Sequence, residues 1–370
     1  MFPDSLLRID LYTKEIIPIS LKPEGDALIA SPARHSPGDG EQYYISPGFI
    51  DLHTHVLDAF TLLGVKADTI GWRDGVHVLA DAGSAGSDTA NAFPEYIFPA
   101  NKTPIKVWLN INATGIVDLQ ECRDLRFLNV EKCAAYARSH RDWICGVKVR
   151  TSADVVGDQG IRPLMLAKQA AREAELPLMV HVGREPPTIE DVLHVLEKGD
   201  VVSHFLHGKN NRLFDENGSP GAAFLRAKDR GVIFDVAHGA GSFSYETARH
   251  ALKAEISGFC ISTDMHAYSM PGVVKSLSRT MTKLYNLGFP LIDIISGVTK
   301  IPAEILGLDR WDDFVMGEPV KRATIFRLRP WRESDGEYND AHHNVLNVSQ
   351  VIEPLYVIGR RGTIPEACCG

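Results

Sequence analysis

The stretch PGFIDLHTH, residues 47–55, joins a short apolar run to two histidines that are separated by one residue. Phe49 and Ile50 belong to an apolar run that predicts a β-strand. Side chains at i and i+2 of a strand point to the same side, so His53 and His55 project together. Two imidazoles in that arrangement are suited to chelating one metal ion. Taken by itself, the pair is also compatible with two polar residues in a loop.

Seven further apolar runs follow this one, and stretches with helical periodicity lie between them, as at residues 161–175 and 188–199. Successive runs are about 30 residues apart, which leaves room for one helix in each gap. The spacing predicts an α/β fold, a (β/α)8 barrel over residues 48–307, although a doubly wound open sheet would give a similar alternation. The eight runs are centred, in chain order, at Ile50, Leu79, Trp108, Val147, Val180, Val202, Ile233 and Ile261.

The chain outside the predicted barrel consists of residues 1–47 and 308–370, and both pieces contain short strand-like fragments. Because such fragments can pair with one another, we expect one small β-domain made from both termini. The polar stretch RESDGEYNDAHHN, residues 332–344, predicts a solvated loop. The strand-like fragments are LLRIDLY (6–12), ATIFRLRP (323–330) and PLYVIGRRG (354–362).

The composition is that of an ordinary soluble globular protein, with 370 residues, 44% of them hydrophobic and 23% charged. The net charge of −8 provides no basic field, which argues against nucleic acid and anionic membrane as partners. No apolar stretch approaches the roughly 18 residues of a transmembrane helix, and residues 1–20 scatter charges where a signal peptide needs an apolar run. Six cysteines without CxxC spacing indicate a reduced, cytoplasmic protein, in which Cys145 and Cys260 are expected to be buried free thiols. The expected partners are a small-molecule substrate and, in a homo-oligomer, further copies of the same chain.

Four more residues with chemically active side chains each end a different strand run. Active sites of (β/α)8 barrels are built where the carboxyl ends of the strands converge, so these side chains should meet His53 and His55 at one mouth. Imidazole and carboxylate are suitable ligands for Zn²⁺ and its neighbours in the transition series. The four residues are Lys148, His181, His204 and Asp264.

Lys148 is the unusual member of this set, because an ammonium group repels a metal ion. A neutral lysine amine can instead capture CO2 as a carbamate, an anionic group whose two oxygens can bridge two metal ions. The alternative for Lys148 is an ammonium paired with an acidic neighbour, and for His181 or His204 a hydrogen-bonded histidine of the core. The occurrence of all six residues at strand ends favours the metal site.

Several motifs at these strand ends are those of one known family. PGFIDLHTHV, the lysine of the fourth strand, HVG, SHFLHGK and STDMH resemble the amidohydrolase superfamily of binuclear metal hydrolases. The closest resemblance is to its dihydroorotase-like amidohydrolase/deacetylase subgroup, and it extends over about residues 47–308 through DAGSAGS, LNINATGI and DVAHGAGSFSYETA. The resemblance also implies that the terminal pieces form a small β-sandwich.

The resemblance implies two divalent metal ions, zinc in both sites, that are bridged by a carboxylated Lys148. It further implies that a metal-bridging hydroxide attacks the substrate carbonyl. Asp264 would take the proton from that hydroxide and deliver it to the leaving amine or alkoxide. The implied ligands are His53, His55 and Asp264 for the more buried ion, and His181 and His204 for the other.

The resemblance favours hydrolysis of an amide or ester bond in a small acylated carboxylate, such as an N-acyl amino acid or an O-acetyl hydroxy acid. The first alternative is a cyclic amide hydrolase of the dihydroorotase or dihydropyrimidinase type. Dihydroorotases carry an arginine two residues beyond the HxH pair to bind the substrate carboxylate, and this chain has Leu57 there. The second alternative is a catalytically silent barrel scaffold, which would be expected to have lost one or more of the six ligands.

Four further residues are candidates for substrate contact. Asn112 ends the third strand, with an ordinary turn as its alternative role. His207 and Lys209 lie in the loop after His204, where they are suited to orienting a ligand or binding a substrate carboxylate, or have only a loop role. His238 lies just past the seventh strand and is suited to a hydrogen bond with substrate.

Overall fold

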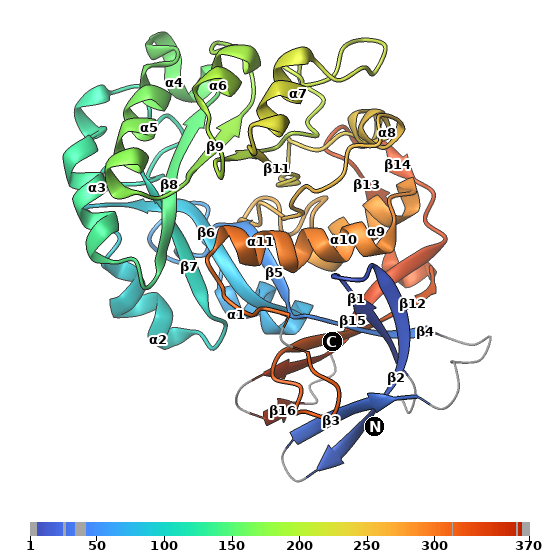
Figure 1. Ribbon diagram of the computed structural model, residues 1–370. Coiled ribbons are helices and arrows are strands. Elements are labelled where there is room, and N and C mark those ends of the chain that lie inside the picture. The colour runs from blue at the N-terminus through green and yellow to red at the C-terminus, as the bar shows by residue number, and fades with distance from the viewer. Residues whose placement is uncertain (1–5, 25–26, 34–41, 313, 360–361, 365–370) are drawn as a thin grey trace.

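The computed structural model describes residues 6–24, 27–33, 42–312, 314–359 and 362–364 (Figure 1). Two seven-stranded sheets organise the chain. One sheet is surrounded by helices, and the other is formed by strands from the first and last parts of the sequence.

The helix-covered sheet contains only parallel strands, in the order β11-β10-β9-β8-β7-β6-β5. Each strand coincides with one of the apolar runs of the sequence. The strands are β5 (Phe49–Thr54), β6 (Val76–Gly86), β7 (Ile105–Asn110), β8 (Ile144–Thr151), β9 (Leu178–Val182), β10 (Val201–Ser203) and β11 (Ile233–Asp235).

The eighth apolar run closes the sheet into a barrel without forming a regular strand of its own. Cys260 makes a parallel bridge with Asp235 of β11, and Met265 makes one with Thr54 of β5. Between these bridges the backbone nitrogen of Asp264 donates to the carbonyl of His53, 2.8 Å away. The eighth position is therefore filled, and the carboxyl ends of all eight runs face one mouth.

The barrel interior below the mouth is filled with side chains. The indole of Trp108 on β7 lies over Gly146 on β8, where an added Cβ would be 2.2 Å from the ring. Glycine is thus required at this position by close packing. The buried members of the interior cluster are Ile50, Leu52, Val78, Ala80, Ala82, Trp108, Cys145, Met179, Val201, Cys260, Ala303, Leu306 and Trp311.

The helices cover the outside of the barrel (Figure 1). The two helical patterns in the sequence correspond to α5 (Arg162–Ala174), which ends at Glu175 in the left-handed region, and α6 (Ile189–Val195). Thr188 caps α6 by accepting a hydrogen bond from the backbone nitrogen of Asp191. The other helices are α1 (Ala67–Ile70), α2 (Phe98–Ala100), α3 (Val130–Ser139), α4 (Ala153–Val156), α7 (Ala222–Asp229), α8 (Tyr245–Lys253), α9 (Leu277–Leu287), α10 (Leu291–Val298) and α11 (Lys300–Ile305).

The second sheet combines both termini in the order β16-β15-β12-β4-β1-β2-β3. Its two edge strands, β16 and β3, contact each other, so the sheet folds over its own apolar core. The predicted fold class, a (β/α)8 barrel with a small β-sandwich domain from both termini, is confirmed. The domain boundaries at residues 48 and 307 stay a prediction. The strands are β1 (Leu6–Asp10), β2 (Glu15–Glu24), β3 (Ala27–Pro32), β4 (Gln42–Ser46), β12 (Ala323–Pro330), β15 (Gln350–Gly359) and β16 (Gly362–Ile364).

Residues 331–349, here named the C-terminal hairpin, leave the sandwich and pack on the barrel. They contain the paired strands β13 (Tyr338–Asn339) and β14 (Val345–Leu346). The prediction of a solvated loop at residues 332–344 is wrong in part, because Tyr338 and Asp340 are buried. Arg279 of α9 stacks on the Tyr338 ring at 3.7 Å, and Asp340 accepts from the backbone nitrogen of Tyr245, the first residue of α8.

Two further expectations concern cysteines and membranes. Cys145 and Cys260 are buried free thiols, as predicted, whereas Cys368 and Cys369 lie outside the described residues. In the part of the chain that the structure describes, no helix has the length and apolarity needed to cross a membrane.

Candidate metal centre

Three of the predicted ligands form a tight cluster at the mouth of the barrel. One potential ligand atom from each of His53, His55 and Asp264 lies within 4.8 Å of the others. Oδ1 of Asp264 lies 3.5 Å from Nε2 of His53 and 3.2 Å from Nε2 of His55. Both imidazoles come from the end of β5, and the carboxylate comes from the eighth run, which is hydrogen-bonded to β5.

The imidazole of His204 presents an unpartnered nitrogen that a metal ion at this mouth would satisfy. Its Nδ1 donates to the carbonyl of Ala237 at 2.6 Å, and because a carbonyl only accepts, Nε2 must carry a lone pair. That Nε2 atom is buried and has no hydrogen-bond partner among the described residues. It lies 4.0 Å from Oδ2 of Asp264. A buried acceptor without a partner is costly, and a metal ion would satisfy it.

The rings of His53 and His55 are held from behind by serine hydroxyls. Nδ1 of His53 lies 3.0 Å from Oγ of Ser203, and Nδ1 of His55 lies 2.9 Å from Oγ of Ser84. Ser203 in turn donates to the buried carboxylate of Asp235, so Nδ1 of His53 is the protonated nitrogen. Nε2 is then free to bind a metal, an arrangement that commonly orients histidine ligands.

Three buried aspartates behind the ligands were not singled out in the sequence, although each lies on or at the end of a strand run. Asp51 accepts from both the backbone nitrogen and the hydroxyl of Thr263, which positions the residue preceding Asp264. Burial raises the pKa of Asp51 and of Asp235 to about 7. The signal that would have found them is the same alternation that identified the ligands. The three aspartates are Asp51, Asp81 and Asp235.

Lys148 is fully buried, and its Nζ lies 3.3 Å from Nε2 of His53. Among the described residues no ion pair joins this Nζ to a carboxylate, but the charges of Asp264, Asp235 and Asp81 act on it and favour its protonated form, so both the carbamate and the ammonium stay predictions. Burial lowers the pKa of Lys148 to about 7. Gly83, at φ +89°, leaves room for it, since a Cβ there would lie 2.6 Å from Cγ of Lys148.

His181 completes the group from the end of β9. Its ring centroid lies 4.5 Å from that of His204 in an edge-on arrangement, and the centroid of His53 lies 5.3 Å from His204. The topology thus places all six predicted residues at one mouth. Burial lowers the pKa of His204 to about 3 and holds the pKa of His181 well below its usual value. Both imidazoles are therefore neutral, as metal ligands must be.

Asp264 is ionised in this setting. Burial raises the pKa of its carboxyl, but the neighbouring imidazoles, His53 foremost, outweigh burial and hold the pKa well below the usual value. His204 and Asp264 both adopt left-handed backbone conformations, with φ values of 72° and 49°. Such conformations are uncommon for residues with a side chain and are frequent at functional sites.

The four candidates for substrate contact differ in how much of their polar surface is free. The side chain of Asn112 is used within its own loop, where Nδ2 donates to the carbonyl of Glu121 at 2.6 Å and Oδ1 accepts from Thr114. Both ring nitrogens of His238 are engaged, by Lys283 and by the carbonyl of Gly239. These bonds favour positioning roles, and substrate contact by Asn112 or His238 stays a prediction.

Of the other two candidates, His207 is buried and Lys209 is partly exposed. Nδ1 of the buried His207 accepts from the backbone nitrogen of Lys209 at 3.0 Å, which shapes the loop. The Lys209 ammonium is half-buried, and its Nζ is 3.4 Å from Oγ of Ser242. Its charge contributes to lowering the pKa of both His181 and His204, so Lys209 faces this half of the mouth.

Arg150, which the sequence reading did not single out, lies two residues after Lys148 on β8. Its guanidinium holds both carboxylate oxygens of the buried Glu121, at 2.6 and 2.7 Å. Its charge also contributes to lowering the pKa of His181. An arginine at i+2 from a ligand on the same strand points to the same side, which is the signal that could have identified it.

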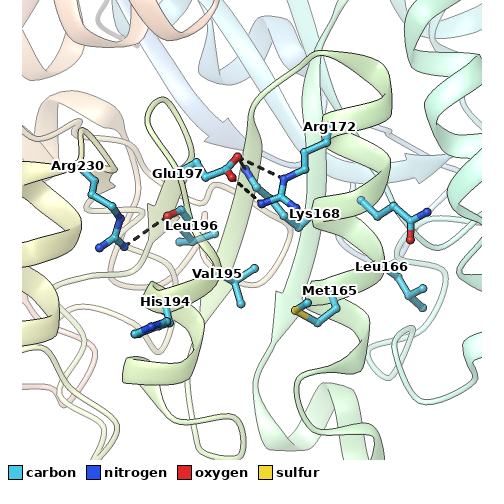
Figure 2. A pocket seen from close by; sticks show the side chains of 10 residues that line it. Met165, Leu166, Lys168, Arg172, His194, Val195, Leu196, Glu197 and Arg230 are labelled. Atoms are coloured by element: carbon cyan, nitrogen blue, oxygen red, sulfur yellow. Dashed lines mark hydrogen bonds and ion pairs between the residues drawn. The ribbon is translucent and has the colours of Figure 1, made fainter.

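A separate hollow of about 700 Å³ lies on the flank of the barrel between α5 and α6, and Figure 2 shows its lining. Lys168 and Arg172 of α5 point there toward Glu197. None of the candidate ligands lines this hollow. It is therefore distinct from the mouth where the imidazoles gather.

Comparisons with known proteins agree with this architecture. No family model matches the chain. A deacetylase of Enterococcus faecalis is 36% identical over 289 residues, 77% of this chain and 78% of the relative. A deacetylase of Agrobacterium fabrum is 33% identical over 337 residues, 90% of this chain and 82% of the relative. A deacetylase of Brucella anthropi is 33% identical over 323 residues, covering 86% and 79%.

Two solved structures extend the likeness over nearly the whole chain. A dihydroorotase, 30% identical, has a TM-score of 0.83 and covers 96% of this chain and 93% of its own. An adenine deaminase, 29% identical, has a TM-score of 0.85 and covers 98% of both chains. The barrel and its cluster of imidazoles and carboxylate define a hydrolase of the amidohydrolase type. Within that class, the chain belongs to the deacetylase-like family of the amidohydrolase superfamily.

Proposed function

We propose that this protein is a binuclear metal-dependent deacetylase that hydrolyses the amide or ester bond of a small acylated carboxylate. The observation that carries the proposal is the mouth itself, where His53, His55 and Asp264 converge within 4.8 Å beside the unpartnered Nε2 of His204. The curated relatives, all of which are deacetylases, support an acetyl group as the acyl part.

The donor set fits two divalent ions, in our proposal zinc. Nitrogen and carboxylate ligands suit zinc, and the neutral imidazoles of His181 and His204 together with an ionised Asp264 are in the protonation states that metal binding requires. When bound, the two ions would make a water acidic enough to attack at neutral pH and would polarise the substrate carbonyl. Lys148 would join them as a carbamate, since its buried amine has no ion-pair partner among the described residues. The ligands proposed are His53, His55 and Asp264 for one ion, His181 and His204 for the other, and Lys148 for both.

In this proposal Asp264 moves the proton. Its pKa lies well below the usual value, so the carboxylate is ionised and able to accept a proton at neutral pH, with Oδ1 facing His53 and His55 and Oδ2 facing His204. It would accept a proton from the attacking water and pass it to the leaving amine or alkoxide. Asp51 binds Thr263, the residue before Asp264, and Ser203 binds the ring of His53. These two contacts would keep the Asp264 carboxylate in place for the proton transfer.

The substrate carboxylate is assigned to the side of the mouth near His181. The charges of Arg150 and Lys209 both act on the His181 imidazole, but the guanidinium of Arg150 is paired with Glu121, so an anion bound there would be attracted chiefly by Lys209. Lys209 is only half-buried and has one weak hydrogen bond, to Ser242, which makes it the more available of the two.

Cyclic amide hydrolysis is the second candidate, and the likeness to the dihydroorotase structure favours it. Dihydroorotases have an arginine at the position of Leu57, and here Leu57 is buried in the apolar core and provides no cation for a substrate carboxylate. For this reason we rank deacetylation first.

The test is a screen of the zinc-loaded protein, prepared with bicarbonate, against paired N-acetyl and O-acetyl acids, with dihydroorotate, hydantoin and dihydrouracil beside them. We expect turnover of an acetylated acid and loss of that turnover in Asp264→Asn. Turnover of only the ring amides would establish the second candidate instead. Less than about one metal ion for every two chains after loading would exclude the binuclear centre and leave the barrel a scaffold.

A further inference from the structure

The backbone segment Ala237–Gly239 contacts both halves of the candidate metal centre. The carbonyl of Ala237 accepts the Nδ1 hydrogen of His204 at 2.6 Å. On the other side, Gly239 lies so close to Asp264 that an added Cβ would be 2.6 Å from Oδ2. A displacement of this one segment would therefore move His204 and Asp264 together.

The segment is held in an unusual conformation. Ala237 and Gly239 have φ values of 38° and 57°, and the Ala237 value is uncommon for a residue with a side chain. The backbone nitrogens of His238 and Gly239 donate to the carbonyls of Ser262 and Thr263, which continues the pairing with the eighth run. Such a conformation persists only where surrounding contacts determine it.

Those contacts come from His238 and Lys283, which are both fully buried. Nδ1 of His238 donates to the carbonyl of Gly239 at 2.9 Å, so its Nε2 carries a lone pair. Nζ of Lys283 lies 2.7 Å from this Nε2 and 2.7 Å from the carbonyls of Val273 and Asn339. In its protonated form Lys283 has three hydrogens, one for each of these acceptors. Burial holds the pKa of this amine well below its usual value, so the three contacts rest on their geometry.

One of the three acceptors belongs to the C-terminal hairpin. Asn339 lies on β13. Two more contacts tie the hairpin to the chain that follows Ala237–Gly239: Ala341 donates to the carbonyl of Phe243, and Asp340 accepts from the backbone nitrogen of Tyr245 at the start of α8. The Phe243 ring stacks on His238 at 4.5 Å. The buried Nζ of Lys283 on α9 thus joins the hairpin to the segment behind the ligands.

We propose that Lys283 and His238 act as a positioning pair, which holds Ala237–Gly239 against His204 and Asp264 and makes the C-terminal hairpin a support of the metal centre. The inference rests on the proposed function, because it takes His204 and Asp264 as ligands. Neither Lys283 nor His238 touches substrate in this assignment. Their effect is transmitted through Ala237 and Gly239.

The experiment measures metal affinity of the full-length chain by chelator competition, with zinc and with cobalt, whose visible spectrum reports ligand geometry. Lys283→Met keeps the length of the side chain and removes the ammonium. We expect its affinity to fall about tenfold, as for other residues that orient a metal ligand, and its cobalt spectrum to change.

The matched control is Lys168→Met, which removes another buried lysine at the flank hollow of Figure 2. It should lower the melting temperature and leave metal affinity and cobalt spectrum unchanged. If Lys168→Met weakens metal binding as much as Lys283→Met does, general destabilisation explains both and the positioning pair is refuted.

A second pair of variants decides the matter if Lys283→Met does not fold. His238→Gln can place an oxygen near the former Nε2 and accept from Lys283, whereas His238→Asn reaches only the former Nδ1 position. We expect the glutamine variant to retain more metal affinity than the asparagine variant. Equal, wild-type affinity in both would overturn the inference, while a wild-type protein that binds no metal would overturn the proposed function and this inference with it.

Discussion

Two buried lysines in this protein lie in opposite chemical settings, one at the flank of the barrel and one at its mouth. Lys168 on α5 is paired with Asp200 at 2.5 Å and with Glu197 at 3.0 Å. Lys148 on β8 has no carboxylate within 4.0 Å among the described residues and faces the Nε2 atom of His53 instead. A buried ammonium without an ion-pair partner is costly. The ion pairs of Lys168 therefore account for its burial, whereas the burial of Lys148 favours a functional role.

The first test compares the loss of one carboxylate in each region, Asp264 at the mouth and Asp200 at the flank, and should give the greatest change in kcat. Asp264→Asn at the mouth should lower kcat by about 10³-fold or more, because the proton acceptor is lost. Asp200→Asn at the flank should lower the melting temperature and leave kcat of the folded protein close to that of the wild type. Steady-state kinetics with an acetylated acid, together with thermal unfolding, would measure both. Normal activity in Asp264→Asn would refute the proposed mechanism.

The next test exchanges the lysines themselves. Lys148→Met should lose at least about half of the bound metal after loading with zinc and bicarbonate, since ligand deletion removes the bridge between the two sites. Lys168→Met should keep its metal and lose about 3–5 kcal/mol of unfolding free energy, because Asp200 is left buried without its partner. Elemental analysis and denaturant unfolding distinguish the two. A reversed pattern would mean that Lys148 is the structural lysine.

The pH dependence of metal loading sharpens the same contrast. Burial lowers the pKa of Lys148 to about 7, so the neutral amine that captures CO2 becomes abundant as the pH rises through 7. Loading of metal-free protein at constant dissolved CO2 should therefore accelerate between about pH 6 and pH 8. The pKa of His204 is lowered to about 3, so this imidazole stays neutral throughout that window, whereas burial raises the pKa of Asp51 and of Asp235 to about 7 and both titrate within it. Loading that slows as the pH rises would contradict the carbamate.

The smallest expected effect concerns two glycines with the same backbone conformation. Gly83 at the mouth and Gly199 at the flank both have φ +89°, but only Gly83 has a neighbour at the position of an added Cβ, Cγ of Lys148 at 2.6 Å. Alanine should strain both backbones equally. Gly83→Ala should cost about 1–3 kcal/mol more in unfolding free energy, from overpacking against Lys148. Equal costs in denaturant unfolding would show that Lys148 yields easily.

Much of the barrel was readable from the sequence because its strands are buried on both faces and form apolar runs. The eighth run was also recognised, although it closes the ring through bridges at Cys260 and Met265 and has no regular strand. Some of its backbone groups bond side chains, as the backbone nitrogen of Thr263 does when it donates to the carboxylate of Asp51. Nothing in the local sequence distinguishes such a segment from an ordinary strand.

The hydrogen-bond partners behind the ligands were much less readable. The partner of His53 is Ser203, and the partner of His238 is Lys283, each separated from it by a long stretch of chain. The polar residues 332–344 predict a solvated loop, yet Tyr338 is covered by Arg279 and Asp340 accepts from the first backbone nitrogen of α8. Burial of a polar residue depends on partners that only the folded chain brings to it.

The barrel and the residues that end its strands follow from local properties of the chain, namely the periodic pattern of apolar residues and their position at strand ends. The folded chain was needed to show which nitrogen of His204 is free, that no described carboxylate forms an ion pair with Lys148, and that Lys283 contacts His238. Each of these features depends on the spatial distance between groups that are far apart in the chain. Short-range hydrogen bonds and charges depend on such distances, and a single sequence does not contain them.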